Sequence, residues 1–340
     1  MTPLLAPGVH LLAPGLFQPQ PDGWPQPPRL PALEGVLARG AWQSLGAAGT
    51  DATLLALFGV LPRADAPPPI AALSHLAEFG GTLNERLLLA APVHLHPDRD
   101  KLRLFAGEVL AIDEAESRRL LAEFNAHFAD RGLRLEWAAA DRWYLHAPTP
   151  PAIQAVPLAD ALGHSVQEHL PTGPEARFWH GVLNETQMLF HLSEVNRQRE
   201  GRGALPLNSL WLWGSGQAIK VPARPFAALY ADDLPSRGLA RLADTPCFGL
   251  AALAPRTSLP PGALLVVDSA PGEALARQQP GPWLDALKGL EQRLGDLLAL
   301  RPAVPLWLYG GDGRRCQLSP LARYRLWRTR RPWGKAASSA

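Results

Sequence analysis

Short apolar runs alternate with longer amphipathic stretches near both ends of the chain, and this alternation limits the fold more than any other feature. Runs that are apolar throughout are typical of strands buried on both faces of a sheet. Such predicted strands are 9–13, 227–230, 263–268 and 304–309, and the predicted helices are 30–39, 52–58, 70–79, 235–242 and 282–300. Strands that alternate with helices favour an α/β fold built on a doubly wound, mainly parallel sheet.

The middle of the chain has a different pattern. Its predicted strands are 86–95, 101–105, 133–137, 142–146 and 210–213, and its predicted helices are 113–130 and 174–199. The pair 133–137 and 142–146 has the spacing of a hairpin. We therefore expect residues 1–84 and 217–330 to form an α/β core, residues 85–216 an inserted α+β subdomain, and residues 331–340 a flexible tail.

Composition excludes several classes of protein. The formal net charge is +2 from 33 basic and 31 acidic residues, which is too small to indicate a nucleic-acid partner by bulk electrostatics. The arginine-rich segment 323–331 fits a solvent-facing terminal helix better than a nucleic-acid contact. No apolar run approaches the roughly 18–20 residues that span a bilayer, so no membrane is expected. Two cysteines exclude a disulfide framework, although one bridge stays open. A cytoplasmic protein without a signal peptide is the expectation.

Thr50 is the first candidate for chemistry. It stands between Gly49 and Asp51 at the predicted start of a short apolar helix. A hydroxyl there can act as a nucleophile or help to bind an anion at the helix N-terminus. The simpler interpretation, which we favour from the residues alone, is that Thr50 or Asp51 caps the helix.

The predicted helix 174–199 carries a polar stripe. Residues spaced by 4, 3 and 4 share one side of a helix, and here they are His180, Asn184, Gln187 and His191. Amide and imidazole side chains fit the wall of a partly enclosed cleft, whereas an ordinary amphipathic helix is the alternative. The side opposite the stripe, with Phe178, Val182, Leu189 and Leu192, is predicted to pack on the core.

Two further patterns have alternative explanations. His94 and His96 share one face of a predicted strand and could bind zinc if a third ligand approached, but half-exposed strand residues are the more common case. Gly214 and Gly216 follow a strand, yet the third glycine of a dinucleotide-binding motif is missing.

Several of these segments together resemble a known family. Residues 208–216 (Asn-Ser-Leu-Trp-Leu-Trp-Gly-Ser-Gly), with Asn196 and Arg199 before them, resemble the motif that closes the inserted domain of archaeal-type, cofactor-independent phosphoglycerate mutases, which belong to the alkaline phosphatase superfamily. Segments 33–40 and 49–52 resemble the first helix and the nucleophile turn of that family. Segments 92–95, 98–100, 184–188 and 206–211 are similar to RpfE-type regulatory proteins of bacteria.

The resemblance implies an alkaline phosphatase-like core with two divalent metals held by Asp and His, and this chain departs from that pattern. Ala13-Pro14-Gly15 stands where the family has an Asp-Gly turn, and no histidine occurs after His191. Asp268 and Asp312 are the residual candidates for metal ligands, but Gly313 follows Asp312 where a histidine is expected. Without metals, the Thr50 hydroxyl has little to lower its pKa.

Our hypothesis is therefore a phosphoglycerate mutase-like protein that has lost its dinuclear metal site and acts by binding, in regulation. No cofactor is expected, and the partner is a small phosphorylated or carboxylate metabolite, or a protein. The residues expected to bind it are Asp98, Arg99, Arg142, His180, Asn184, Gln187, His191, Asn196, Arg199 and Asn208. The alternative is an active mutase or phosphohydrolase that holds two Mn or Zn ions and uses Thr50, Asp51, Asp268 and Asp312.

Overall fold

The computed structural model describes residues 7–18, 20–61, 67–98, 101–162, 165–253, 260–300 and 304–324, together with Trp333. The chain divides into two compact units, Met1–Pro62 with Lys220–Ala340 and Arg63–Ile219. We call these the first and the second unit. The helix Ile70–Phe79, which the predicted boundaries assign to the core, clusters with the second unit.

The first unit is built on a seven-stranded sheet with the order β2-β12-β11-β1-β10-β8-β9. Its strands are β1 (Val9–Leu12), β2 (Ala41–Ala48), β8 (Ala228–Ala231), β9 (Cys247–Phe248), β10 (Leu264–Val267), β11 (Leu306–Tyr309) and β12 (Asp312–Leu318). The pairs from β11 through to β9 are parallel, whereas β12 pairs antiparallel with both β11 and β2. The predicted fold class, α/β with a mainly parallel sheet, is confirmed.

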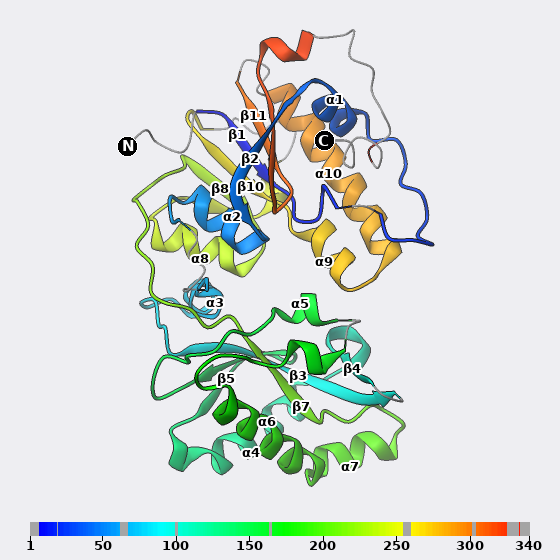
Figure 1. Ribbon diagram of the computed structural model, residues 1–340, viewed down its shortest axis with the longest axis vertical. Helices are drawn as coiled ribbons and strands as arrows, with labels where there is room; N and C mark the ends of the chain where they lie inside the picture. Colours follow the sequence, from blue (N-terminus) through cyan, green and yellow to red (C-terminus); the bar gives the residue numbers. More distant parts are fainter. Residues whose placement is uncertain are drawn as a thin grey trace. The chain divides into compact units, whose positions relative to one another are not determined.

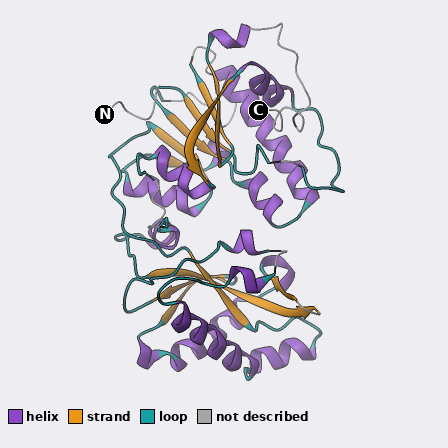
Figure 2. Ribbon diagram, viewed as in Figure 1, coloured by secondary structure: helices purple, strands orange, loops and turns teal. Residues whose placement is uncertain are grey.

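Helices cover both faces of this sheet (Figures 1 and 2). They are α1 (Pro31–Arg39), α2 (Thr50–Leu57), α8 (Leu234–Leu242), α9 (Ala270–Ala276) and α10 (Pro280–Leu300). Four leucines of α10 at helical spacing are at most 2% exposed and join the core with Val36 of α1: Leu287, Leu290, Leu294 and Leu297. Burying each such side chain contributes about 1.5–3 kcal/mol, so α10 holds this face of the sheet together.

The second unit is built on a five-stranded sheet around a long central strand. The strands are β3 (Leu87–Asp98), β4 (Lys101–Phe105), β5 (Arg134–Ala139), β6 (Arg142–His146) and β7 (Ser209–Trp213). The order is β4-β3-β6-β5, β7 also pairs with β3, and all these pairs are antiparallel. The predicted hairpin is thus present as β5–β6.

Helices of the second unit are α3 (Ile70–Phe79), α4 (Glu114–His127), α5 (Leu158–Ala161), α6 (Ala176–His191) and α7 (Glu194–Gly201). Short 3-10 helices of this unit lie at Gly107–Leu110, Ala129–Arg131 and Val166–His169, and those of the first unit lie at Leu250–Ala252 and Leu321–Tyr324. The single helix predicted over 174–199 is wrong, because Ser193 interrupts it and caps α7 through a hydrogen bond from the Val195 N–H to its Oγ.

Three smaller findings complete the fold. Cys247 and Cys316 are both free thiols. Trp333 is buried, packs on Trp283 and donates its indole N–H to the Leu16 carbonyl at 2.9 Å. The rest of the predicted tail, and residues 325–332, lie outside the described residues. Within the described segments, no helix has the length and the apolar character needed to cross a bilayer.

Candidate functional site

The carboxyl edge of the parallel sheet in the first unit is the candidate functional site. Asp232 follows β8, Asp268 follows β10, and Asp312 comes after the Gly310-Gly311 turn that ends β11. Ligands of open α/β sheets bind at this edge, where the carboxyl ends of the strands meet. Because β1 lies between β10 and β11, Asp268 is about 10 Å, or two strand spacings, from the turn before Asp312.

A cavity of about 500 Å³ opens at this edge beside Asp268. Its lining combines three carboxylates from different elements, Asp232, Asp268 and Asp296, with the guanidinium of Arg293. Asp232 already accepts a hydrogen bond from the Leu250 N–H at 3.2 Å. The cavity is therefore acidic, with one internal cation close to its most buried carboxylate.

Asp268 is fully buried and pairs with Arg293 of α10. The Nε of Arg293 donates to Oδ2 of Asp268 at 3.0 Å, and Nη2 donates to the same oxygen. Burial raises the pKa of Asp268, and the nearby Arg293 only partly offsets that effect. Oδ1 is buried without a hydrogen-bond partner among the described residues. The ionised form of this carboxyl is thus costly in the fold.

Asp312 is paired in a similar way with an arginine two residues on. The Nε of Arg314 donates to Oδ2 of Asp312 at 2.6 Å, and the Arg314 backbone N–H donates to Oδ1 at 3.1 Å. The guanidinium also lies over the rings of Phe17 and Trp42 and donates to the Phe17 carbonyl. Arg314 is therefore fixed by cation–π contacts as well as by the carboxylate.

Thr50 lies against the same turn as Asp312. Gly49, at a φ of 101°, is the N-cap of α2, and its N–H donates to the Gly311 carbonyl at 2.8 Å. A Cβ on Gly311 would lie 3.0 Å from the Thr50 Oγ1, so hydroxyl and turn are packed together. The predicted capping by Thr50 or Asp51 is wrong, because the cap position is taken by a residue without a side chain. Thr50 and Asp51 lie in the first turn of α2, where the negative charge of Asp51 interacts favourably with the helix dipole.

The resemblance implies a pair of divalent cations held by Asp and His, whereas Asp268 and Asp312 at this edge pair with arginines. His10 is the one histidine in the sequence of the first unit. It is buried on β1, where its Nδ1 is 2.8 Å from the Tyr309 Oη and its ring stacks on Trp307 at 4.4 Å. Asp268 and Asp312 already neutralise arginines, and two further dications beside those guanidinium groups would be repelled.

Two predicted ligand residues of the second unit, Asn196 and Asn208, bond to the protein itself. Asn196 donates to the carbonyls of Phe190 and Leu207 and accepts from the Leu207 N–H, all within 2.9 Å. Asn208 pairs with both the N–H and the carbonyl of Leu95. These contacts join α6, α7 and β3 to the chain around β7, and a ligand-binding role for both residues stays a prediction.

Arg199 is fully buried between α7 and α4. Its Nε donates to the Leu205 carbonyl at 2.8 Å, and its other nitrogens bond to Glu116 and to the Leu110 carbonyl. Arg202 reaches the second oxygen of Glu116 from a half-exposed position. Glu116 in turn closes a capping box with Asp113 at the start of α4. The arrangement stabilises the subdomain.

The polar stripe of α6 lies beside its buried face. Asn184 and His191 are exposed, Gln187 is half-buried, and His180 is held by the Pro171 carbonyl at 2.8 Å. The predicted core side of the helix is partly wrong: Val182 is buried, but Phe178 is 45% and Leu192 is 74% exposed. The buried residues are Trp179, Val182, Leu183, Thr186 and Phe190.

The remaining candidates are more scattered. Arg142 pairs with Glu78 at 2.6 Å, and Glu78 also accepts the Tyr144 hydroxyl at 2.6 Å. Arg99, Asp100 and the side chain of Asp98 lie outside the described residues. His94 and His96 have adjacent rings, with His94 Nδ1 on the Pro206 carbonyl.

The sequence analysis missed a cluster of His75, Glu136 and His146 in the second unit. His75 and His146 are 71 positions apart, so no local spacing links the three residues. The predicted hairpin of 133–137 with 142–146 indicated only that Glu136 and His146 lie on neighbouring strands.

Comparison with known proteins supports part of the resemblance. A 2,3-bisphosphoglycerate-independent phosphoglycerate mutase of Methanosarcina barkeri is 35% identical over 77 residues, 23% of this chain and 19% of that protein. A probable enzyme of the same name from Geobacter sulfurreducens is 28% identical over 176 residues, 51% of this chain and 44% of that protein. This chain is similar to cofactor-independent phosphoglycerate mutases over part of its length. It spans less than half the length of these curated relatives.

The fold is shared more widely. The PH0037 protein from Pyrococcus horikoshii superposes with a TM-score of 0.59 over 92% of this chain and 87% of that one, at 13% identity, which shows a common fold alone. No protein-family model matches the chain.

Proposed function

We propose that this protein is a phosphoglycerate mutase-like protein that acts by binding, as a regulatory protein of the RpfE type, and not by metal-dependent phosphoryl transfer. The observation that carries the proposal is the pairing of Asp268 with Arg293 and of Asp312 with Arg314. The two guanidinium groups occupy the carboxylate oxygens that metal cations would need as ligands. The one histidine in the sequence of the first unit, His10, is buried in its sheet.

The proposed ligand is a small metabolite with phosphate or carboxylate groups. Most basic residues of this chain are arginines, with only four lysines among 33, and arginine bonds both oxygens of such groups at once. Arg142 supports this best among the predicted ligand residues, because its side chain is 37% exposed and it forms an ion pair with Glu78. A protein partner is the alternative occupant.

Calorimetric titration of the full chain with 2- and 3-phosphoglycerate tests the metabolite. Loss of the Arg142 contact in Arg142→Ala is expected to weaken binding by about tenfold or more. Arg118→Ala is the matched control, since Arg118 is an exposed arginine that pairs with Glu114 on one helix face. If neither phosphoglycerate gives a heat of binding, the metabolite hypothesis is excluded and the protein partner is the remaining one.

A mutase assay tests the absence of catalysis. The protein is freed of metal by a chelator and assayed with added Mn²⁺ or Zn²⁺, and we expect no turnover above background. The catalytic alternative instead requires turnover that disappears in both Thr50→Ala and Asp268→Asn, with about two bound metal ions per chain at the sheet edge.

A further inference from the structure

His75, Glu136 and His146 come from α3, β5 and β6 of the second unit and converge on one carboxylate oxygen. Oε2 of Glu136 lies 3.0 Å from the Nε2 of His75 and 2.6 Å from the Nε2 of His146. The side chains are 16%, 28% and 22% exposed in the order His75, Glu136, His146. All three ligand atoms lie within 4.8 Å of one another.

The spacing of the three ligand atoms can be compared with the edges of a zinc coordination sphere. Zinc bonds of about 2.0–2.1 Å in a tetrahedron place neighbouring ligand atoms about 3.3 Å apart. The distances from Glu136 to His75 and to His146 are shorter than that value by about 0.3 and 0.7 Å, differences that side-chain rotations can supply. Two imidazoles and one carboxylate are a donor set that zinc accepts with one position left for water.

One cation already lies near the carboxylate. Nη2 of Arg134 is 3.8 Å from Oε2 of Glu136, and the side chain of Arg134 is 56% exposed.

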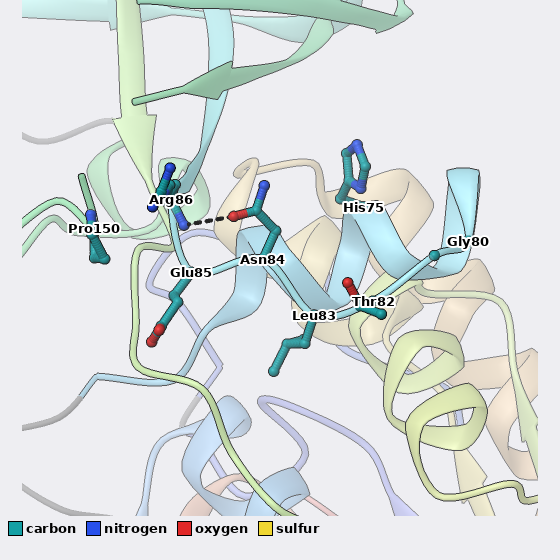
Figure 3. Close-up of a pocket in the computed structure, with 9 residues that line it drawn as sticks. His75, Gly80, Thr82, Leu83, Asn84, Glu85, Arg86 and Pro150 are labelled. Carbon is teal, nitrogen blue, oxygen red and sulfur yellow. Dashed lines mark hydrogen bonds between the residues drawn. The ribbon is translucent and has the colours of Figure 1, made fainter. Parts of the chain in front are cut away.

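The cluster has access to solvent at His75. This residue lines a cavity of about 490 Å³ together with the loop that follows α3. Figure 3 shows its imidazole projecting from the helix beside the loop that carries Gly80, Thr82 and Asn84. The rings of Tyr144 and His146 lie nearly perpendicular to the imidazole of His75, with centroids 5.1 and 5.8 Å away.

We propose that His75, Glu136 and His146 form a zinc site in the second unit, with water in the fourth position. The ion would join α3 to the β5–β6 hairpin, two elements far apart in sequence. The site is separate from the carboxylates of the first unit, so it stands whether or not those bind metal.

The test is equilibrium dialysis of the chelator-treated full chain against zinc, with metal counted by mass spectrometry. One equivalent is expected, with weaker binding of Mn²⁺ and Mg²⁺ because two of the three donors are nitrogen. His75→Ala and Glu136→Gln should each weaken zinc binding by about 10- to 100-fold or more. His127→Ala is the control, since His127 is a half-exposed histidine of the same unit outside the cluster.

Cobalt absorption gives a second measurement. Cobalt in place of zinc should show the intense visible bands of a tetrahedral site, and these should disappear in Glu136→Gln, which keeps the shape of the side chain and so the fold. No stoichiometric zinc, or zinc binding unchanged in His75→Ala and Glu136→Gln, would overturn the proposal. Zinc lost only in Asp268→Asn would also overturn it, and would contradict the proposed function as well.

Discussion

Both units hold a buried pair of an arginine and a carboxylate, but the buried member differs. In the second unit Arg199 is fully buried and Glu116 is 11% exposed. In the first unit Asp268 is fully buried and Arg293 is 26% exposed. The guanidinium of Arg199 donates to Glu116 and to two backbone carbonyls, whereas one oxygen of Asp268 has no hydrogen-bond partner among the described residues.

The difference separates a stabilising pair from a costly one. A buried guanidinium with all its hydrogen bonds made holds elements together, and it becomes a large penalty only if its partner is removed. A buried carboxylate with a raised pKa is unfavourable in the ionised form at neutral pH. Costly ionisable groups with shifted pKa values are typical of functional sites, so of these two pairs Asp268 with Arg293 is the better candidate for a functional role.

The largest effect is expected for Glu116→Gln. The substitution keeps the shape of the side chain but leaves the buried Arg199 charge uncompensated, and the free energy of unfolding should fall by about 3–5 kcal/mol. Urea denaturation followed by circular dichroism measures the loss. Arg202→Ala removes the half-exposed partner of the same carboxylate and should change stability by about 1 kcal/mol or less. A loss below about 1 kcal/mol for Glu116→Gln would show that the second unit does not depend on this pair.

Asn196→Ala is expected to have the next largest effect. It removes three hydrogen bonds from a side chain that is 3% exposed, and it leaves buried backbone groups of Phe190 and Leu207 without partners. The expected loss of stability is about 2–3 kcal/mol. Asn184→Ala, on the exposed side of α6, is the control and should leave stability within about 0.5 kcal/mol. Equal effects in the two variants would mean that Asn196 has no special structural role.

The smallest effect is expected for Asp268→Asn. Arg293 is 26% exposed, so water can solvate its charge once the carboxylate is removed. The free energy of unfolding at pH 7 should therefore change by about 1 kcal/mol or less in either direction. The change has a predictable pH dependence. Because the pKa of Asp268 is raised in the folded state, the stability linked to its proton is complete below the ordinary value of 3.8 and is lost as the pH rises through the raised value.

The variant lacks this titration, so the stability of Asp268→Asn relative to the wild type should improve as the pH rises from about 4 towards neutrality. Thermal unfolding at several pH values measures the trend. A relative stability that falls over the same range would show that the ionised carboxylate stabilises the fold, as the carboxylate of the second unit does.

The sequence predicted most elements with strong local patterns. The strands 101–105 and 142–146 and the helix 70–79 have the bounds of β4, β6 and α3. It missed β2 and β12, because Ala41–Ala48 is largely exposed and Asp312–Leu318 is mostly polar. β2 and β12 form through antiparallel pairing with each other at one side of the sheet. Residues distant in sequence make this pairing, so a local hydrophobic pattern does not predict it.

The candidate site was less predictable than the fold. Asp268 and Asp312 were candidates because the family resemblance implies metal ligands there, but no sequence pattern pointed to their arginine partners: Arg293 lies 25 residues beyond Asp268 on α10. Asn196, Arg199 and Asn208 have the residue types of a ligand site, yet tertiary hydrogen bonds use them within the fold. Residue type alone does not separate these two roles.

Anomalous X-ray diffraction from crystals of the full chain, grown with Mn²⁺ or Zn²⁺ and recorded at the absorption edge of each metal, tests the central claim most directly. The account predicts no anomalous peak beside Asp268 or Asp312, with Arg293 and Arg314 still bonded to those carboxylates. Two peaks on that edge of the sheet, with the guanidinium groups displaced, would contradict it.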